Sequence, residues 1–171
     1  MERVEPMIDE ARIAARIAEL GKQVRQDFGD VPIVCVAVLK GSIFFLADLM
    51  RAIPGDARCE FLGVSSYHGT TSTGVVRITH DLPASVEGKH VLIVEDIVDT
   101  GLTLDFLLRS FSMRNPASLK VACLLDKPSR RKVHVPVDYV GFTIPDEFVV
   151  GYGLDFDERF RNLPWVGIYK G

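Results

Sequence analysis

The stretch Val91-Leu-Ile-Val-Glu-Asp-Ile-Val-Asp-Thr-Gly-Leu-Thr103 decides the fold of this chain. Its apolar start predicts a strand over residues 89–94 that is covered on both faces. Acids and small residues then interrupt the apolar run, and a helix is expected over residues 102–113. A buried strand that passes through a polar turn into a helix indicates a parallel sheet flanked by helices. Ligands of such sheets bind beyond the carboxyl ends of the strands.

The same alternation of strand and helix extends along the chain. Apolar residues recur at the spacing of an amphipathic helix between residues 8 and 28, and a second helix is expected over residues 43–53. Further strands are expected at residues 32–39, 59–65, 75–79, 119–125, 138–142 and 165–169. The pattern predicts an α/β fold with a mainly parallel twisted sheet, and no linker divides residues 1–171 into separate domains.

Composition excludes several classes of protein. The chain has 171 residues, of which 47% are hydrophobic and 25% charged, as in a globular protein with one core. A net charge of −3 gives no general reason for nucleic-acid binding. No apolar run approaches the ~20 residues that cross a bilayer, and the first residues lack a signal-peptide pattern. We therefore expect a cytoplasmic protein with no nucleic-acid or membrane partner.

Two groups of residues are interpreted as structural. Cys35, Cys59 and Cys123 each lie in an apolar stretch and lack the paired spacing of a zinc site, so we expect buried thiols. The basic run Arg130-Arg131-Lys132 is typical of a solvated loop.

The polar turn after residue 94 carries the chemistry. The adjacent carboxylates of Glu95 and Asp96 would repel each other unless a ribose diol, a hydrated magnesium ion or water lies between them. The following Asp-Thr-Gly-Leu-Thr sequence places hydroxyls and a glycine at the start of a helix, where free N–H groups favour a phosphate. The alternative is that Asp99 or Thr100 only caps the helix while Glu95 and Asp96 are solvated. The chain contains neither of the common glycine-rich phosphate motifs.

Residues 91–103 resemble the phosphoribosyl-diphosphate-binding signature of the type I phosphoribosyltransferases. Four further segments resemble the 6-oxopurine branch, the hypoxanthine-guanine phosphoribosyltransferase family: Val38-Leu-Lys-Gly41, Ser65-Ser-Tyr67, Leu124-Leu-Asp-Lys127 and residues 140–155. The resemblance implies the fold of that family, with a small irregular hood formed by the chain ends. It also implies transfer of the phosphoribosyl group from phosphoribosyl diphosphate to N9 of hypoxanthine or guanine, with Mg²⁺, giving IMP or GMP and diphosphate in purine salvage by a homodimer or homotetramer.

The resemblance implies a role for each polar turn. Asp99 would be the general base that manages the proton on the purine ring. The carboxylates of Glu95 and Asp96 would hold the ribose hydroxyls and, with Asp155, the metal ion. The 5-phosphate would be bound by Asp99, Thr100, Gly101, Leu102 and Thr103. The diphosphate would be bound by Lys40, Gly41, Ser66, Tyr67 and Arg161, and the purine by Lys127, Phe148, Val149 and Asp155.

Three details of this assignment have a physical reason. Lys127 can donate a hydrogen bond to the 6-oxygen of a purine but cannot accept one from an amino group, so it should reject adenine. The family also implies a cis peptide between Lys40 and Gly41, where N–H groups meet the diphosphate. Residues 66–74 are small, polar and glycine-punctuated, which indicates a mobile loop that would exclude water from the reaction as a lid.

Other interpretations remain open from the sequence. Each of the charged residues could be an ordinary surface group, and the base could be xanthine. A regulatory protein that kept the site as a sensor is a rival of a different class, against which the joint presence of Asp99, Lys127, Phe148 and Asp155 argues. The acid Asp126, directly before Lys127, is a departure from the family pattern.

Overall fold

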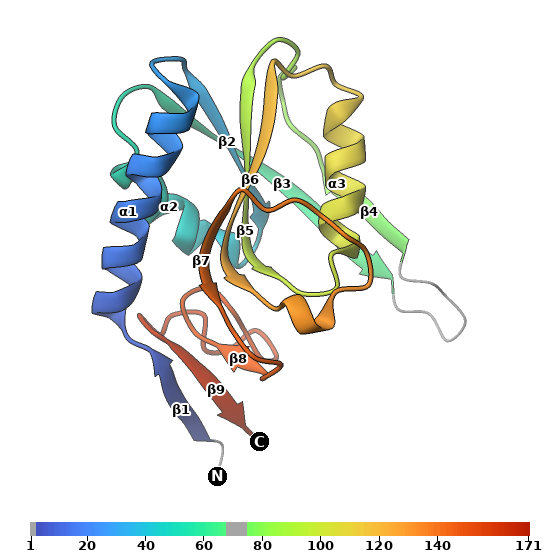
Figure 1. Ribbon diagram of the computed structural model, residues 1–171. Helices are drawn as coiled ribbons and strands as arrows, with labels where there is room; N and C mark the ends of the chain where they lie inside the picture. The colour runs from blue at the N-terminus through green and yellow to red at the C-terminus, as the bar shows by residue number, and fades with distance from the viewer. Residues whose placement is uncertain (1–2, 68–74) are drawn as a thin grey trace.

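A six-stranded sheet forms the centre of the protein in a computed structural model, which describes residues 3–67 and 75–171 (Figure 1). Its strand order is β4-β3-β2-β5-β6-β7. Neighbouring strands from β3 to β7 are parallel, and β4 pairs antiparallel with β3 at one edge. The strands are β2 (Ile33–Leu39), β3 (Ala57–Tyr67), β4 (Val75–His80), β5 (His90–Val98), β6 (Ser118–Asp126) and β7 (Tyr139–Thr143). The predicted mainly parallel sheet is therefore confirmed.

Helices cover both faces of this sheet. In Figure 1, α1 (Glu10–Phe28) and α2 (Ser42–Ala52) lie on one side, and α3 (Leu102–Ser112) lies on the other. Side chains alternate along β2, so Cys35 and Ala37 join the core beneath α1 and α2, while Val34 and Val36 join the core beneath α3. Because both faces of the sheet are covered, the sequences of the central strands are continuous apolar runs.

The chain ends form a second, three-stranded antiparallel sheet, which we call the hood. Its order is β1 (Arg3–Ile8), β9 (Val166–Lys170) and β8 (Val149–Val150). Strand β1 was not expected, since the helical pattern was extended back to residue 8. The helix begins at Glu10 instead, because Asp9 caps it by accepting a hydrogen bond from the Arg12 N–H at 2.8 Å.

Two smaller expectations are corrected. Strand β3 continues through Ser66 and Tyr67, whose backbones pair with Val76 and Val75 of β4, so these residues do not belong to a loop. The rest of the proposed lid, residues 68–74, lies outside the described residues. Cys59 is exposed, because α2 packs on β2 and β5 and leaves this part of β3 uncovered. The prediction of buried thiols is confirmed for Cys35 and Cys123. Within the described ranges, no helix is long and apolar enough to cross a membrane.

Candidate active site

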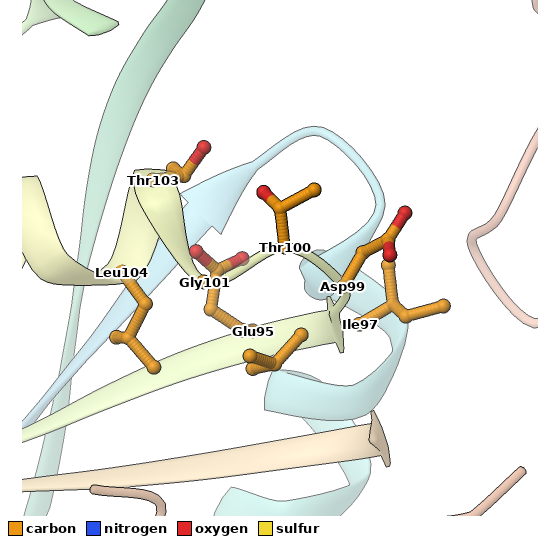
Figure 2. Close-up of a pocket in the computed structure, with 8 residues that line it drawn as sticks. Glu95, Ile97, Asp99, Thr100, Gly101, Thr103 and Leu104 are labelled. Carbon is orange, nitrogen blue, oxygen red and sulfur yellow. The ribbon is translucent and has the colours of Figure 1, made fainter. Parts of the chain in front are cut away.

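The turn between β5 and α3 forms a small cavity at the carboxyl end of the sheet. The cavity measures about 100 Å³ and is lined by residues from Glu95 to Leu104, shown in Figure 2. Gly101, with φ 83°, occupies the N-cap position of α3, and no side chain caps the helix. Thr100 Oγ1 receives only a long contact of 3.4 Å from the Leu102 N–H. The capping alternative for Asp99 and Thr100 is therefore wrong, and the helix start remains available to an anion.

The segment after β6 supports this turn. Arg131 donates hydrogen bonds to the backbone oxygens of Asp99 at 2.7 Å and Val98 at 3.2 Å, and it forms an ion pair with Asp126. The Lys132 N–H donates to the Thr100 oxygen at 2.9 Å. The solvated-loop interpretation of the basic run is thus wrong for Arg131. The unusual Asp126 beside it was the signal that sequence reasoning left unused.

The adjacent acids Glu95 and Asp96 face different cavities. Successive side chains of a strand point to opposite faces, and Glu95 lines the cavity under the α3 turn while Asp96 lines a second cavity near Phe148. Burial raises the pKa of Glu95 well above its usual range, and the Asp96 charge adds to this rise. Burial also raises the pKa of Asp96 to about 6, although the Ile97 N–H that donates to its carboxylate opposes the shift. Ile97 and Asp99 line both cavities and lie between them.

The second cavity has a volume of about 270 Å³ and brings together distant parts of the chain. It is lined by Asp96, Ile97, Asp99, Lys127, Phe148, Val149, Leu154 and Asp155. Lys127 is only 7% exposed, and its ammonium has no hydrogen-bond partner within the described residues. Lys127 lines the cavity, so its ammonium is available to donate a hydrogen bond to a ligand oxygen there. Phe148 is 53% exposed and meets the Phe156 ring edge-on at 5.9 Å, which leaves ring surface open for stacking.

Asp99 is held by a cation in this structure. Arg130 Nε donates to Asp99 Oδ1 at 3.1 Å, and another nitrogen of Arg130 lies 3.7 Å from Asp146. Arg130 ends the short 3-10 helix Pro128–Arg130, which directly follows Lys127. One short segment therefore contacts the Asp99 carboxylate and carries the buried lysine.

The loop between β2 and α2 meets the segment 151–161 at the edge of the second cavity. A Cβ atom at Gly41 would overlap the Asp96 carboxylate and lie 2.9 Å from the Gly153 oxygen, so only glycine fits there. Arg161 donates to the Gly153 oxygen at 2.7 Å and pairs with Asp155 at 2.9 Å, while its Nε is buried without a partner. Lys40 is exposed and pairs with Glu158 at 3.0 Å.

The cis peptide lies one bond earlier than expected, between Leu39 and Lys40. Strand β2 ends at Leu39, and Gly41 already has helical backbone angles of −59° and −34°. The chain thus turns within the peptide that directly follows the strand.

The carboxylates around the second cavity suit a magnesium ion. Asp96 and Asp155 line this cavity and offer the oxygen donors that Mg²⁺ prefers, whereas Glu95 faces the cavity under the α3 turn. The Asp155 charge contributes to the raised pKa of Asp96, a repulsion that a cation would relieve. No group of three or more His, Cys, Asp or Glu side chains in residues 3–67 and 75–171 converges as a metal site. The residues therefore fit an ion held by one or two carboxylates together with substrate oxygens.

A parallel sheet with an acidic strand end, an uncapped helix start for a phosphate and a hood over the opening defines a phosphoribosyltransferase. Residues 7–157 match the phosphoribosyl transferase domain family, and the chain belongs to it. The chain is 52% identical to the hypoxanthine-guanine phosphoribosyltransferase of Mycobacterium avium over 91% of this chain and 80% of that protein. It is 50% identical to the hypoxanthine phosphoribosyltransferase of Escherichia coli strain K12 over 96% and 94% of the two chains.

Solved structures agree with this placement. A crystal structure of a hypoxanthine-guanine phosphoribosyltransferase from Bacillus anthracis superimposes with a TM-score of 0.93 at 44% identity, and the match covers 100% of both chains. Within the wider family, the chain belongs to the hypoxanthine-guanine phosphoribosyltransferases.

Proposed function

We propose that this chain transfers the 5-phosphoribosyl group from phosphoribosyl diphosphate to N9 of a 6-oxopurine, hypoxanthine or guanine, and releases IMP or GMP and diphosphate. The observation that carries the proposal is the junction of the two cavities at Asp99. One cavity offers a helix start for the 5-phosphate, and the other offers the Lys127 ammonium and the Phe148 ring for a flat base with an exocyclic oxygen. A ribose that joins phosphate to base would lie beside Asp99.

The position of each residue gives it a separate role in this reaction. The α3 turn from Asp99 to Thr103 binds the 5-phosphate, and Glu95 and Asp96 hold ribose hydroxyls from the two faces of β5. The negative charge of Asp96 stabilises the positive charge that develops on the sugar as the bond to diphosphate breaks, whereas the raised pKa of Glu95 favours its neutral form. Asp99 accepts the proton of the purine ring. To do so, its carboxylate must either lose the hydrogen bond from Arg130 or accept the proton on its other oxygen. Phe148 stacks on the base, and the Val149 backbone meets its edge.

The diphosphate side of the site is formed by cations and a backbone turn. The backbone of Gly41 lies beside Asp96. Arg161 can exchange its carboxylate partners, Asp155 and Glu158, for two phosphate oxygens of the diphosphate. Lys40, exposed next to them, adds a second cation, and Ser66 and Tyr67 complete this group at the end of β3. When bound, Mg²⁺ would neutralise diphosphate charge, with Asp155 and Asp96 or Glu95 as its carboxylate ligands. Oligomerisation as a homodimer or homotetramer and a cytoplasmic location remain predictions.

The test is nucleotide formation from phosphoribosyl diphosphate and MgCl₂ with hypoxanthine, guanine, xanthine and adenine in parallel. We expect IMP and GMP to form, adenine to be rejected and an excess of chelator to stop turnover. Preferential use of xanthine would change the base specificity but not the reaction. Failure to turn over any 6-oxopurine, with phosphoribosyl diphosphate still bound, would leave the regulatory-sensor interpretation instead.

A further inference from the structure

Tyr152 joins the two parts of the protein that flank the diphosphate side of the site. It lies in the segment 151–161, which carries Asp155 and Arg161, and its hydroxyl donates a hydrogen bond to Asp48 of α2. The same helix begins at Ser42, directly after the turn of Lys40 and Gly41. The contact therefore connects the helix that follows the glycine turn to the segment that supplies the arginine.

The backbone around Tyr152 is shaped for this contact. Tyr152 has φ 48° between Gly151 at φ 97° and Gly153 at φ 99°. A tyrosine in the left-handed region costs about 1 kcal/mol or more, so surrounding contacts must hold it there. The Tyr152 N–H donates to the Leu163 oxygen at 2.8 Å, and the Gly153 N–H donates to the Arg161 oxygen at 3.0 Å. These turns place the Gly153 backbone directly against the Gly41 oxygen, where no Cβ atom would fit.

The Tyr152 side chain is held by packing and by its hydrogen bond. Its ring lies 6.4 Å from the Phe44 ring in a tilted arrangement and also borders a cavity of about 270 Å³ lined in part by Phe44 and Asp48. The residue is only 7% exposed, and its hydrogen bond to a carboxylate adds a defined length and direction to this packing. Arg51 holds Asp48 from the other side at 2.8 Å, so the acceptor itself is oriented.

We propose that Tyr152 and Asp48 are positioning residues for diphosphate recognition, setting the separation between the Gly41 turn and Arg161. This inference rests on the proposed function, because it takes diphosphate as the group bound between them. Most of the purine side of the site is formed by other elements, with Lys127 after β6 and Val149 in β8, and the segment 151–161 adds only Leu154 and Asp155 to the lining of that cavity. Loss of the tyrosine hydroxyl should therefore affect the binding of phosphoribosyl diphosphate much more than the binding of the base.

The chain offers a matched control. Tyr139 is also buried, at 3% exposure compared with 7% for Tyr152, and its hydroxyl also donates to an aspartate, Asp27, at 2.9 Å. That bond joins α1 to the first residue of β7, and neither residue lines the cavities of the site. Tyr152→Phe and Tyr139→Phe thus remove the same kind of hydrogen bond, and only Tyr152→Phe removes it beside the diphosphate side.

Steady-state kinetics with Mg²⁺ and hypoxanthine give the decisive comparison. For Tyr152→Phe we expect the KM for phosphoribosyl diphosphate to rise about three- to thirtyfold, the range of coupling carried through packed side chains. The KM for hypoxanthine and kcat should stay within about twofold. Tyr139→Phe should lower the melting temperature to a similar degree without moving either KM. Asp48→Asn keeps an acceptor oxygen and should show a smaller rise than Asp48→Ala.

An unchanged KM for phosphoribosyl diphosphate in both Tyr152→Phe and Asp48→Ala would overturn the inference. An equal rise of the KM for phosphoribosyl diphosphate in Tyr139→Phe would also overturn it, because the rise in Tyr152→Phe would then be an effect of general destabilisation. Calorimetric titration with magnesium phosphoribosyl diphosphate separates this inference from the proposed function. A wild-type protein that binds this compound but does not turn over would refute the function alone, and the binding constants of the variants would still decide the inference. A wild type that does not bind it would refute both.

Discussion

Asp99 and Lys127 line one cavity from the ends of neighbouring parallel strands. Each is the residue directly after its strand, β5 or β6, and the Lys127 N–H donates to the Val98 oxygen at 2.9 Å. Val98 and Asp126 are in register and parallel strands lie about 4.8 Å apart, so the two strand ends bring an acid and an amine to the same cavity. Substitutions at the two positions should distinguish their roles.

Replacing Asp99 by asparagine should reduce kcat about 100-fold or more while the dissociation constant for phosphoribosyl diphosphate changes only a few fold. A general base contributes about 10²–10⁴ to rate, whereas the helix start that binds the phosphate is left intact. Turnover and calorimetric binding are compared in the same preparations. Asp105→Asn, which removes an acid from the first turn of α3, should leave both values unchanged. Near-normal turnover in Asp99→Asn would place the base elsewhere.

Replacing Lys127 by methionine should weaken discrimination at position 6 of the base. The change keeps an unbranched side chain that is one atom shorter and removes the ammonium, and a hydrogen bond to a charged group contributes about 1.5–3 kcal/mol. We expect kcat/KM for hypoxanthine to fall about 10- to 150-fold, with adenine affected much less. Lys132→Met, at an exposed position of the same loop, is the control. An equal loss of kcat/KM for hypoxanthine and adenine would mean that Lys127 supports the cavity and does not distinguish the two bases.

The sequence predicted this part of the molecule well because its signal is local. Residues 89–113 change from an apolar run to acids and then to a helical pattern, which correctly placed α3 and the start of β5. The expected end of the strand at residue 94 was wrong, because β5 continues through Glu95 and Asp96 to Val98. Strand alternation would also have shown that Glu95 and Asp96 point to opposite faces, although the two were treated as one pair.

Other features depend on contacts between distant segments. Strand β1 pairs with β9 at the other end of the chain, and such pairing leaves no periodic signal in β1 itself. The orientation of Arg131 toward the α3 turn, in contrast to exposed Lys132, depends on where β6 ends relative to β5. The exposure of Cys59 depends on which strands α2 covers.

The ion pair of Asp81 and Arg114 should make a pH-dependent contribution to stability. Two nitrogens of Arg114 donate to the two oxygens of Asp81 at 2.7 and 3.0 Å, and this hydrogen bonding holds the pKa of Asp81 below its usual value. A lowered pKa in the folded state gives stability that is present above the unfolded value of about 3.9 and is lost as pH falls through the folded value. Because Asp81 is half exposed, we expect at most about 1 kcal/mol.

Urea unfolding of wild type and Asp81→Asn should therefore differ at pH 7, and the difference should shrink as pH falls below 4, measured down to the onset of acid unfolding. In the Arg114→Gln background, Asp81→Asn should have almost no effect, because the partner that lowers the pKa is gone. A pH-independent difference would show that Asp81 acts through packing and not through its charge.

Arg25 should be a strong determinant of stability although it lies far from the site. Its guanidinium donates to four backbone oxygens, those of Pro54 at 2.5 Å, Gly29 at 2.7 Å, Val31 at 2.9 Å and Asp56 at 3.2 Å. These bonds fasten the end of α1 to the turns that precede β2 and β3. Arg25→Ala leaves these oxygens to water and should lower the free energy of unfolding by about 2–3 kcal/mol.

Urea unfolding of Arg25→Ala, Arg25→Lys and Lys22→Ala tests this account. Lysine keeps the charge but donates at most three hydrogen bonds from one atom and lacks the planar fork, so Arg25→Lys should recover only part of the loss. Lys22, exposed on the same helix, should be replaceable at almost no cost. The kinetic constants of all three variants should match the wild type at 25 °C, since these turns lie at the amino ends of the strands and the reaction takes place at the carboxyl ends. A full recovery in Arg25→Lys would show that charge, and not the fork, holds the turns together.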